Sequence, residues 1–384
     1  MKPIYLDYNG TTPHDPEVIA AMRPFLEEEF GNPSSGHLYA VKPRQALNAA
    51  RRQVAGLLNC APEEVVFTSG GTEANNWAII GSARALRARG RHIVTTAFEH
   101  PAVLNVCRFL EKEGFAVSRL PVGAEGVVSL ADVEAALRPD TILVTIMHAN
   151  NEVGTIQPVP AIAALVRARG IRVHTDAAQS AGKIPVDVQA LGVDLLSLAG
   201  HKLYAPKGVG ALYIRHGVAL DPFMHGAGQE GGRRAGTENI LEIVGLGKAC
   251  EIAARDLALN RRHLQAMRDR LHAALAAGIP EMRLNGHPAE RLPNTLSLSF
   301  RGLEANRILE AIGLEVAASA GAACHADSVE ISHVLQAMAV PVEWAKGTLR
   351  LTTGRMTTPA EIDRAAAVII SAVRELRENR PRDP

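Results

Sequence analysis

Residues 171–179 read Ile-Arg-Val-His-Thr-Asp-Ala-Ala-Gln and residues 194–202 read Asp-Leu-Leu-Ser-Leu-Ala-Gly-His-Lys, and these two stretches decide the fold. Each begins with a short run, Ile171–Thr175 and Asp194–Leu198, that predicts a buried strand. Small residues follow each run, together with one charged side chain, Asp176 or Lys202. Ligands of an open α/β sheet bind beyond the carboxyl ends of its strands. We therefore expect both side chains at one binding site.

The flanking sequence continues this alternation of apolar runs and helical patterns. Five further strands are expected at Val65–Thr68, His92–Thr96, Ala116–Leu120, Ile142–Met147 and Gly210–Ile214. Helices are expected at Glu73–Arg89, Ala102–Glu113 and Val159–Arg169, followed by the glycines Gly90, Gly114 and Gly170, which suit left-handed C-caps. The alternation predicts an α/β fold whose sheet is mostly parallel and covered by helices on both faces.

The pattern changes after about residue 255. One face of a long helix is marked by Leu257, Leu264, Met267, Leu271 and Leu275. Strands are then expected at Thr295–Phe300 and Gly347–Leu351, and helices at Ala305–Ile312 and Pro359–Arg377. We expect a large α/β domain over residues 15–255 and a small α+β domain that combines residues 1–14 with residues 256–384.

The composition is that of an ordinary globular protein. The 384 residues include 41 Lys and Arg against 40 Asp and Glu, and 47% are hydrophobic. A formal charge of +1 argues against nucleic acid or an anionic membrane as the main partner, because both attract basic surfaces. No run of about 20 apolar residues predicts a membrane-spanning helix. The first ten residues lack the apolar core of a signal peptide, so we expect a cytoplasmic protein.

The four cysteines are Cys60, Cys107, Cys250 and Cys324. They are too few and too scattered for a disulfide framework or a zinc site, and a reducing compartment fits this usage. We expect no metal centre.

Residues 69–73, Ser-Gly-Gly-Thr-Glu, follow an expected strand and open an expected helix. Small residues, a hydroxyl and free backbone N–H groups at a helix N-terminus can cradle a phosphate. The stretch matches neither the dinucleotide fingerprint nor the nucleotide P-loop, and a capped helix without a ligand explains it equally well.

The charged residues at the strand ends each allow two interpretations. Asp176 can pair with a cationic ring nitrogen or cap the next helix. Lys202 can be desolvated enough for Schiff-base chemistry, although most lysines are solvated surface residues. His100 and Asn151 also follow expected strands, and a lone histidine is more often structural than catalytic. Together, however, a phosphate loop, an acid and a lysine on one sheet are the parts that a pyridoxal phosphate (PLP) site needs.

The chain resembles the PLP-dependent enzymes of fold type I, in the class V aminotransferase branch, and within it the cysteine desulfurases and selenocysteine lyases. The resemblance covers nearly the whole chain. The motifs that carry it are Tyr5–Pro13, Gly31–Ser35, Ser69–Glu73, His174–Gln179, Gly200–Lys202, Gly236–Asn239 and Gly354–Arg355.

This resemblance implies the cofactor contacts. The cofactor-binding residues would be Gly71, Thr72, His100, Asn151, Asp176, Gln179, His201, Lys202 and Thr237. Of these, Lys202 would hold PLP as an aldimine and take the substrate Cα proton, and His100 would stack on the ring. Asp176 would pair with the pyridine nitrogen, and Gln179 would bond the ring hydroxyl. Gly71, Thr72 and His201 would hold the phosphate, with Thr237 reaching in from a second subunit of a homodimer.

The resemblance also implies the substrate contacts. Arg355 would clamp the substrate carboxylate through a bidentate pair, with help from Asn32 and Asn151. Cys324 lies in a loop-like segment of small residues that matches the catalytic cysteine loop of the family. Its thiolate would attack the substrate sulfur or selenium, or its thiol would donate a proton. His325 can lower the pKa of this thiol, and a buried, unreactive cysteine is the alternative.

Four features favour selenocysteine over cysteine as the substrate. Two of them, the motifs Tyr8–Pro13 and Thr145–Asn151, resemble the selenocysteine lyases. Ala199 stands where desulfurases usually carry a phosphate-contacting serine, and residues 321–327 read Gly-Ala-Ala-Cys-His-Ala-Asp, which resembles the selenocysteine lyases. We therefore expect a lyase that converts L-selenocysteine to L-alanine and selenide. The alternative is a cysteine desulfurase that forms a persulfide on Cys324 and passes it to an acceptor protein. A non-catalytic PLP-binding scaffold is a third reading.

Overall fold

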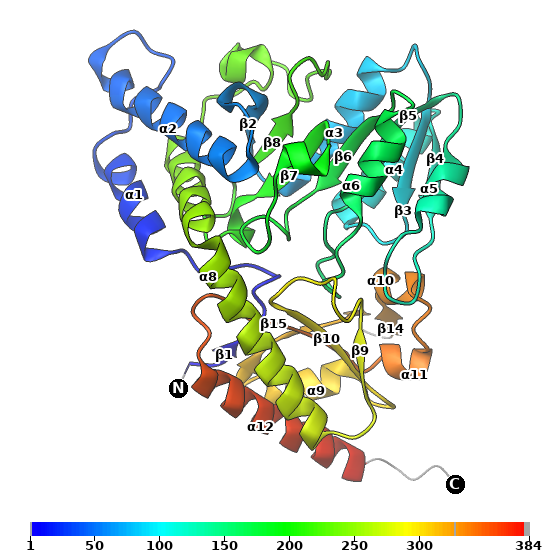
Figure 1. Cartoon of the computed structure of the whole chain (residues 1–384). Coiled ribbons are helices and arrows are strands. Elements are labelled where there is room, and N and C mark those ends of the chain that lie inside the picture. The colour runs from blue at the N-terminus through cyan, green and yellow to red at the C-terminus, as the bar shows by residue number, and fades with distance from the viewer. Residues whose placement is uncertain (1, 326–327, 380–384) are drawn as a thin grey trace.

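The molecule consists of two packed parts joined by one long helix (Figure 1). The computed structural model describes residues 2–325 and 328–379, with the backbone alone over residues 322–325 and 328–330. The upper part in Figure 1 contains a sheet with helices on both faces, and the lower part contains a smaller sheet beside the last helix.

The larger sheet has seven strands, as expected. They are β2 (Val65–Thr68), β3 (His92–Thr96), β4 (Ala116–Leu120), β5 (Thr141–Thr145), β6 (Arg172–Asp176), β7 (Leu195–Ala199) and β8 (Gly210–Ile214). Their order is β2-β8-β7-β6-β5-β3-β4. Only β8 runs against its neighbours, so the prediction of a mostly parallel sheet is confirmed. Strand β6 ends on Asp176 itself, one residue later than predicted.

Helices cover both faces of this sheet because alternate side chains of its strands point to opposite faces. Helices α3 (Gly71–Ala85) and α4 (Pro101–Lys112) pack on Ile93 of β3 and Leu143 of β5. On the other face, α2 (Val41–Leu58), α6 (Val159–Arg167) and α7 (Val188–Leu191) pack on Val94 and Val144. The remaining helices of this part are α1 (Pro16–Glu27) and α5 (Leu130–Ala136).

The three glycines expected to cap helices differ in backbone conformation. Gly114 and Gly170 adopt the left-handed conformation, with φ of +84° and +68°. Gly90 does not, and this prediction is wrong because α3 already ends at Ala85. A Cβ at Gly90 would lie 2.2 Å from the carbonyl oxygen of Asp140, so a close backbone approach explains this glycine.

The smaller part is built on a four-stranded antiparallel sheet of order β12-β15-β10-β9. Its strands are β9 (Met282–Asn285), β10 (Thr295–Phe300), β12 (Ser319–Ala320) and β15 (Thr348–Thr352). The helices beside it are α9 (Ala305–Ile312), α10 (His333–Ala337), α11 (Val342–Ala345) and α12 (Pro359–Glu378). Near the start of the chain, β1 (Ile4–Tyr5) pairs with β11 (Val316–Ala317). A buried apolar cluster of its own runs from Ile4 to Val373.

Helix α8 (Ile240–Gly278) connects the two parts. It packs on α1 and α2 at one end and on α12 at the other. The proposed domain boundary at residue 255 falls inside this helix, so the division into residues 15–255 and the rest stays a proposal. None of the helices in the described part of the chain is both long and apolar enough to cross a bilayer.

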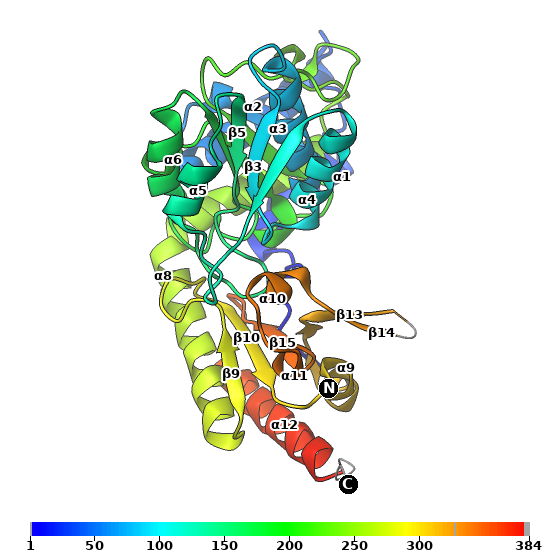
Figure 2. The same ribbon diagram turned by 90° about the vertical axis from the view of Figure 1, so that its right-hand side faces the viewer.

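The hairpin of β13 (Ala322–His325) and β14 (Ser328–Ile331) projects away from the smaller sheet (Figure 2). The segment around Cys324 was expected to be loop-like, and this expectation is wrong for its backbone. Cys324 pairs with Val329 across the hairpin. The side chain of Cys324 lies outside the described residues.

Candidate active site

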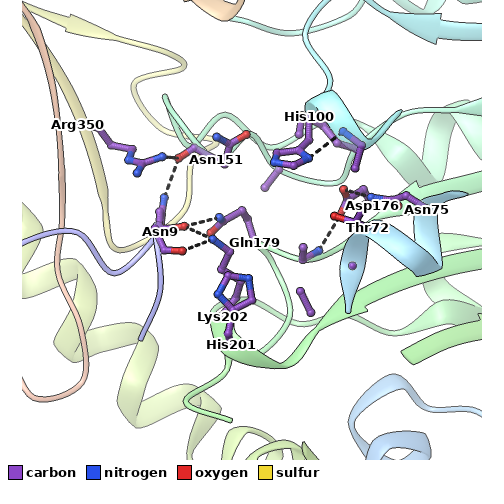
Figure 3. Close-up of a pocket in the computed structure, with 17 residues that line it drawn as sticks. Asn9, Thr72, Asn75, His100, Asn151, Asp176, Gln179, His201, Lys202 and Arg350 are labelled. Atoms are coloured by element: carbon purple, nitrogen blue, oxygen red, sulfur yellow. Dashed lines mark hydrogen bonds between the residues drawn. The ribbon is translucent and has the colours of Figure 1, made fainter. Parts of the chain in front are cut away.

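A cavity of about 260 Å³ opens at the carboxyl ends of β6 and β7 (Figure 3). Eight of the nine predicted cofactor-binding residues line it: Gly71, Thr72, His100, Asn151, Asp176, Gln179, His201 and Lys202. Asn9, Gly10 and Arg350 complete the wall that faces the smaller part. Residues far apart in the sequence therefore meet at the sheet edge where an open α/β fold binds its ligands.

The first turn of α3 forms one wall of this cavity. Gly70, just before the helix, has φ of +145°, a conformation that side chains rarely adopt. A Cβ on Gly71 would lie 3.2 Å from the Cβ of Ala199 on β7, so small residues let the helix approach the strand. The first N–H groups of a helix have no intrahelical partner, and Gly71 and Thr72 at the start of α3 line the cavity. This wall suits a phosphate.

Asp176 places a buried carboxylate at the base of the cavity. It is 6% exposed. One oxygen accepts a hydrogen bond from the side-chain amide of Asn75 at 2.7 Å, and the other accepts from the backbone N–H of Ala178 at 2.9 Å. Among the described residues no cation forms an ion pair with Asp176. A buried carboxylate without a cationic partner suits a ligand that brings an N⁺–H group of its own.

Lys202 enters the cavity from the turn after β7. Its ammonium donates hydrogen bonds to the backbone carbonyls of Asn9 and Gly10, the latter at 2.6 Å. Burial, followed by the nearby Arg350 guanidinium, lowers the pKa of Lys202 to about 8. An amine with this pKa is partly neutral near pH 7, which nucleophilic attack on a carbonyl requires.

Two histidines line opposite sides of the cavity. Nδ1 of His100 accepts the backbone N–H of Ala102 at 3.1 Å, so this residue caps α4 and faces the cavity at once. The structural and the functional reading of His100 are therefore compatible. Burial lowers the pKa of His201 to about 4, with Lys202 as the next cause, and its Nδ1 lies 3.2 Å from the hydroxyl of Thr11. His201 is consequently neutral near pH 7.

Gln179 and Asn151 meet the N-terminal segment at Asn9. The side-chain amide of Gln179 donates to the Asn9 carbonyl at 3.0 Å, and the side-chain amide of Asn9 donates to the Asn151 carbonyl at 3.1 Å. Asn9 is 1% exposed, so this junction is fixed from several sides.

Three other predicted site residues lie outside this cavity. Arg355 lines an adjoining small cavity that shares Lys202. Its guanidinium stacks on the Tyr204 ring at 3.8 Å and lies 3.1 Å from Asp15, while its Nε has no hydrogen-bond partner. Asn32 is exposed and accepts the backbone N–H of Ser34 at 2.9 Å. Thr237 is exposed on the segment before α8.

Sequence reasoning missed three polar residues of the cavity. Asn9 lies inside the motif Tyr5–Pro13. Asn75 lies one turn into α3, and the apolar pattern of this helix gives no signal that Asn75 is functional. Arg350 has a stronger signal, because it is a charged residue in the middle of the predicted strand Gly347–Leu351. Its Nη2 contacts Asp7 at 2.8 Å and Ser319 at 3.1 Å.

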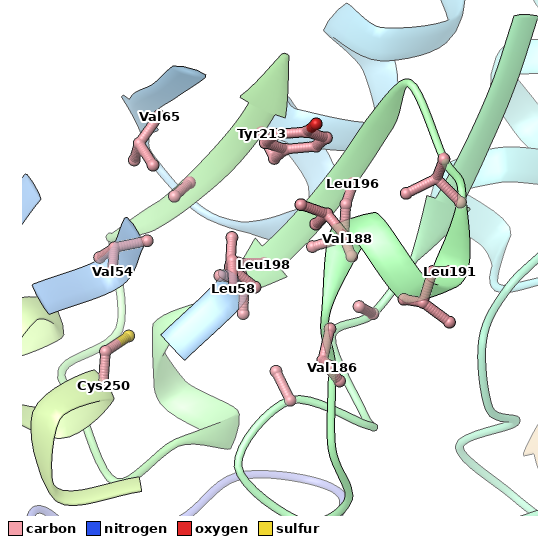
Figure 4. Close-up of a cluster of buried hydrophobic side chains, with 14 of the residues drawn as sticks. Val54, Leu58, Val65, Val186, Val188, Leu191, Leu196, Leu198, Tyr213 and Cys250 are labelled. Atoms are coloured by element: carbon pink, nitrogen blue, oxygen red, sulfur yellow. The ribbon is translucent and has the colours of Figure 1, made fainter. Parts of the chain in front are cut away.

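The other three cysteines belong to the packing of the molecule. Cys250 is fully buried on α8 beside Val54 and Leu58 (Figure 4), and Cys107 is fully buried on α4. Cys60 is partly buried. Burial raises the pKa of each of these thiols to about 12, so none is a thiolate near pH 7.

Comparison with known proteins decides the family. The model of the family described as aminotransferase class-V matches residues 4–365. The chain belongs to the class V aminotransferase family. This class V chain is 47% identical over 384 residues to a protein named cysteine desulfurase IscS from Methanosarcina thermophila, covering all of the chain and 95% of that relative. It is also 47% identical to a cysteine desulfurase IscS from Dictyoglomus turgidum, covering 98% of the chain and 96% of the relative.

Solved structures of class V relatives agree with this assignment. A structure described as a NifS-like protein superimposes with a TM-score of 0.91 at 37% identity, covering 98% of this chain and all of that one. A structure described as SspA in complex with cysteine gives a TM-score of 0.81 at 37% identity, covering 92% and 99%. The class V fold predicted from the sequence, PLP fold type I, is thereby confirmed, and the chain is a PLP-dependent enzyme of the cysteine desulfurase and selenocysteine lyase type.

Proposed function

We propose that this protein is a cysteine desulfurase that converts L-cysteine to L-alanine and retains the sulfur as a persulfide on Cys324. The observation that supports this proposal most is the lining of one cavity. It combines the N-terminus of α3, the buried carboxylate of Asp176, which has no ion-pair partner among the described residues, and Lys202, whose pKa is lowered. The chain is also 47% identical to proteins named cysteine desulfurases.

The residues of the cavity fit PLP. The N–H groups at Gly71 and Thr72 suit its phosphate, and Asp176, which lacks a cation, suits its protonated ring nitrogen. His100 suits the ring face. Bound in this way, PLP supplies an electron sink for the bonds at the substrate Cα. Lys202 would hold the cofactor, and its amine, with a pKa near neutrality, would take the substrate Cα proton.

The sulfur step balances as a displacement at sulfur. The Cys324 thiolate attacks the substrate sulfur, a new S–S bond forms and the substrate Cβ–S bond breaks. The electron pair of the broken bond stays with the carbon skeleton, which takes up a proton to become alanine. No outside oxidant is required. The carbon that keeps the electron pair is reduced, and the sulfur that enters the persulfide is oxidised by the same amount. A thiol of an acceptor protein would then take this sulfur.

The carboxylate contacts stay a proposal as well. Arg355 adjoins the cavity through Lys202 and has an Nε without a partner, so a small side-chain movement would present a guanidinium edge to a carboxylate. Asn151 already lines the cavity. Asn32 lies outside it, and its proposed help depends on a neighbouring chain or a movement.

Selenocysteine is the second candidate substrate. The sequence features that favour it are Ala199, the motifs Tyr8–Pro13 and Thr145–Asn151, and residues 321–327. The relatives compared above favour the alternative reading, cysteine desulfurase, and give no specific support to a selenocysteine preference. A selenol ionises more readily than a thiol, so the same site could process both amino acids.

A homodimer is also part of this proposal. Leu26, Phe30 and Leu38 are 73%, 79% and 88% exposed on one N-terminal segment, beside the exposed Tyr39. Large apolar side chains gathered on a surface mark an interaction site. A second copy covering this segment could bring Thr237 to the phosphate of the partner's cavity.

The deciding experiment measures alanine release from L-cysteine and L-selenocysteine with the PLP-loaded protein, together with the mass of the Cys324 peptide after turnover. We expect alanine from cysteine and a 32 Da increase on that peptide, the mass of one sulfur atom. Alanine without any persulfide on Cys324 would contradict sulfur transfer. A higher kcat/KM for selenocysteine with no persulfide would instead establish the lyase.

A further inference from the structure

Lys183 is a buried lysine that the proposed chemistry does not use. It is 6% exposed and lies in the turn after β6, four residues beyond Gln179. Gly182 has a φ of +72°, and in this turn the Lys183 ammonium contacts both the backbone and the side chain of Gln179. A Cβ at Gly182 would lie 2.4 Å from the side chain of Leu203, so this tight turn also requires glycine for space.

The ammonium of Lys183 has three hydrogen-bond acceptors, one for each of its protons. They are the side-chain oxygen of Gln179 at 2.8 Å, the backbone oxygen of Gln179 at 3.0 Å and the side-chain oxygen of Asn9 at 3.4 Å. Within the described residues no carboxylate forms an ion pair with it, and the nearby charges, Lys202 and Arg350, are both positive. A cation buried in this way is costly, and burial lowers its pKa to about 7.

At a pH below about 7 Lys183 is mainly protonated and can only donate hydrogen bonds, so the group facing it must be an acceptor. The Gln179 carboxamide must therefore turn its oxygen toward Lys183 and its NH₂ group away from it. One of the two N–H bonds of that group donates to the Asn9 carbonyl at 3.0 Å. Because Gln179 lines the cavity, its second N–H is available to a ligand there.

We propose that Lys183 is a positioning residue that fixes the Gln179 carboxamide as a hydrogen-bond donor to the ring oxygen of the bound cofactor. Without Lys183, the carboxamide could turn over and present its oxygen, which would repel a ring oxygen that carries negative charge. The inference rests on the proposed function only in requiring that PLP binds in this cavity.

A double-mutant cycle on PLP binding and on the visible absorption of the bound cofactor tests this proposal. Lys183→Met is expected to raise the PLP dissociation constant about tenfold, the effect of losing one hydrogen bond. The visible absorbance of bound PLP changes with pH, and the midpoint of this change is expected to move to higher pH. In a Gln179→Leu background the same substitution should change the dissociation constant by no more than about threefold, because the donor that Lys183 orients is already absent.

Equal effects of Lys183→Met in both backgrounds would overturn the proposal, because a purely structural role does not depend on Gln179. If Lys183→Met does not fold, the same two measurements are made on Gln179→Glu. Its carboxylate can pair with Lys183 but offers no N–H, so the dissociation constant and the midpoint should rise as in Lys183→Met. Unchanged values would overturn the proposal. Neither the PLP dissociation constant nor the absorbance midpoint involves cysteine. A wild-type protein that binds PLP but does not desulfurate cysteine would therefore contradict the proposed function and leave the role of Lys183 unaffected.

Discussion

The hydroxyl of Ser332 donates a hydrogen bond to the carboxylate of Glu152 at 2.5 Å, and this contact ties the base of the Cys324 hairpin to the cavity. Ser332 directly follows β14, and Glu152 directly follows Asn151. The next residue, His333, bonds the carbonyl of Glu99 at 2.8 Å, beside His100. The backbone N–H of Ser332 also closes the hairpin base on the carbonyl of Gly321 at 3.2 Å. The hairpin is therefore anchored to both loops that carry predicted site residues.

We expect Ser332→Ala to slow persulfide formation on Cys324 by about three- to tenfold, the effect of losing one ordinary hydrogen bond. The cofactor contacts are not altered, so PLP binding should stay at the wild-type value. Single-turnover mass spectrometry of the Cys324 peptide measures the rate. Ser371→Ala, which removes an exposed bond to Glu375 on α12, is the matched control. An equal rate in the two variants would show that the hairpin base does not position Cys324.

We expect Lys202→Ala to abolish covalent attachment of PLP and to lower alanine release by at least about 10³-fold. The fold should persist, because among the described residues the Lys202 ammonium forms hydrogen bonds only with the carbonyls of Asn9 and Gly10. Borohydride reduction followed by mass analysis detects the attachment site. Lys207→Ala, a few residues further along, controls for the loss of a positive charge. A cofactor adduct on another lysine would assign the role elsewhere.

The two arginines near the cavity should respond differently to substitution. Arg355→Lys is expected to raise KM for cysteine on the order of tenfold, because lysine cannot make the bidentate pair. Arg350→Lys should lower the melting temperature instead, because Arg350 links Asp7, Ser319 and the Asn151 carbonyl. Steady-state kinetics and thermal unfolding of both variants separate these roles. If only Arg350→Lys raised KM, the carboxylate contact would be reassigned to Arg350.

Glu99 should make stability depend on pH. Burial raises its pKa to about 8 in the folded protein, whereas an unfolded glutamate has a pKa of about 4.3. Between these values the folded state holds a proton that the unfolded state releases, so the free energy of unfolding should fall as pH rises, by at most about 1.4 kcal/mol per pH unit. Below pH 4 this contribution should be constant.

Denaturant unfolding between pH 5 and pH 8 tests this dependence. Glu99→Gln should reduce the slope, since glutamine does not titrate. Glu111→Gln is the control, because Arg119 hydrogen bonds hold the pKa of Glu111 below its usual value and its titration falls outside this window. A Glu99→Gln slope equal to that of the wild type would place the folded-state pKa of Glu99 near its ordinary value.

The central sheet could be predicted from local sequence because its strands are buried on both faces. Runs such as Val65–Thr68 and His92–Thr96 are short, largely apolar or β-branched, and bounded by turn residues, so their bounds match those of β2 and β3. Helix ends were less certain. The α3 pattern continues toward Arg89, but the helix stops at Ala85, where the chain must turn toward the next strand.

The sequence by itself determined the fold class, the family and the order of Asp176 and Lys202 on the strand ends, because local apolar patterns and motif spacing encode all three. Tertiary structure alone decided which distant residues complete the cavity. Asn9 and Asn75 carry no local signal of function, and Arg350 carries only that of a charged residue inside a strand. Chain folding alone brings these three residues within hydrogen-bond distance of Gln179, Asp176 and the Asn151 loop. The role inferred for Lys183 has the same origin. Its sequence is that of an ordinary surface lysine, and only the folded chain shows that it is buried with no carboxylate partner among the described residues.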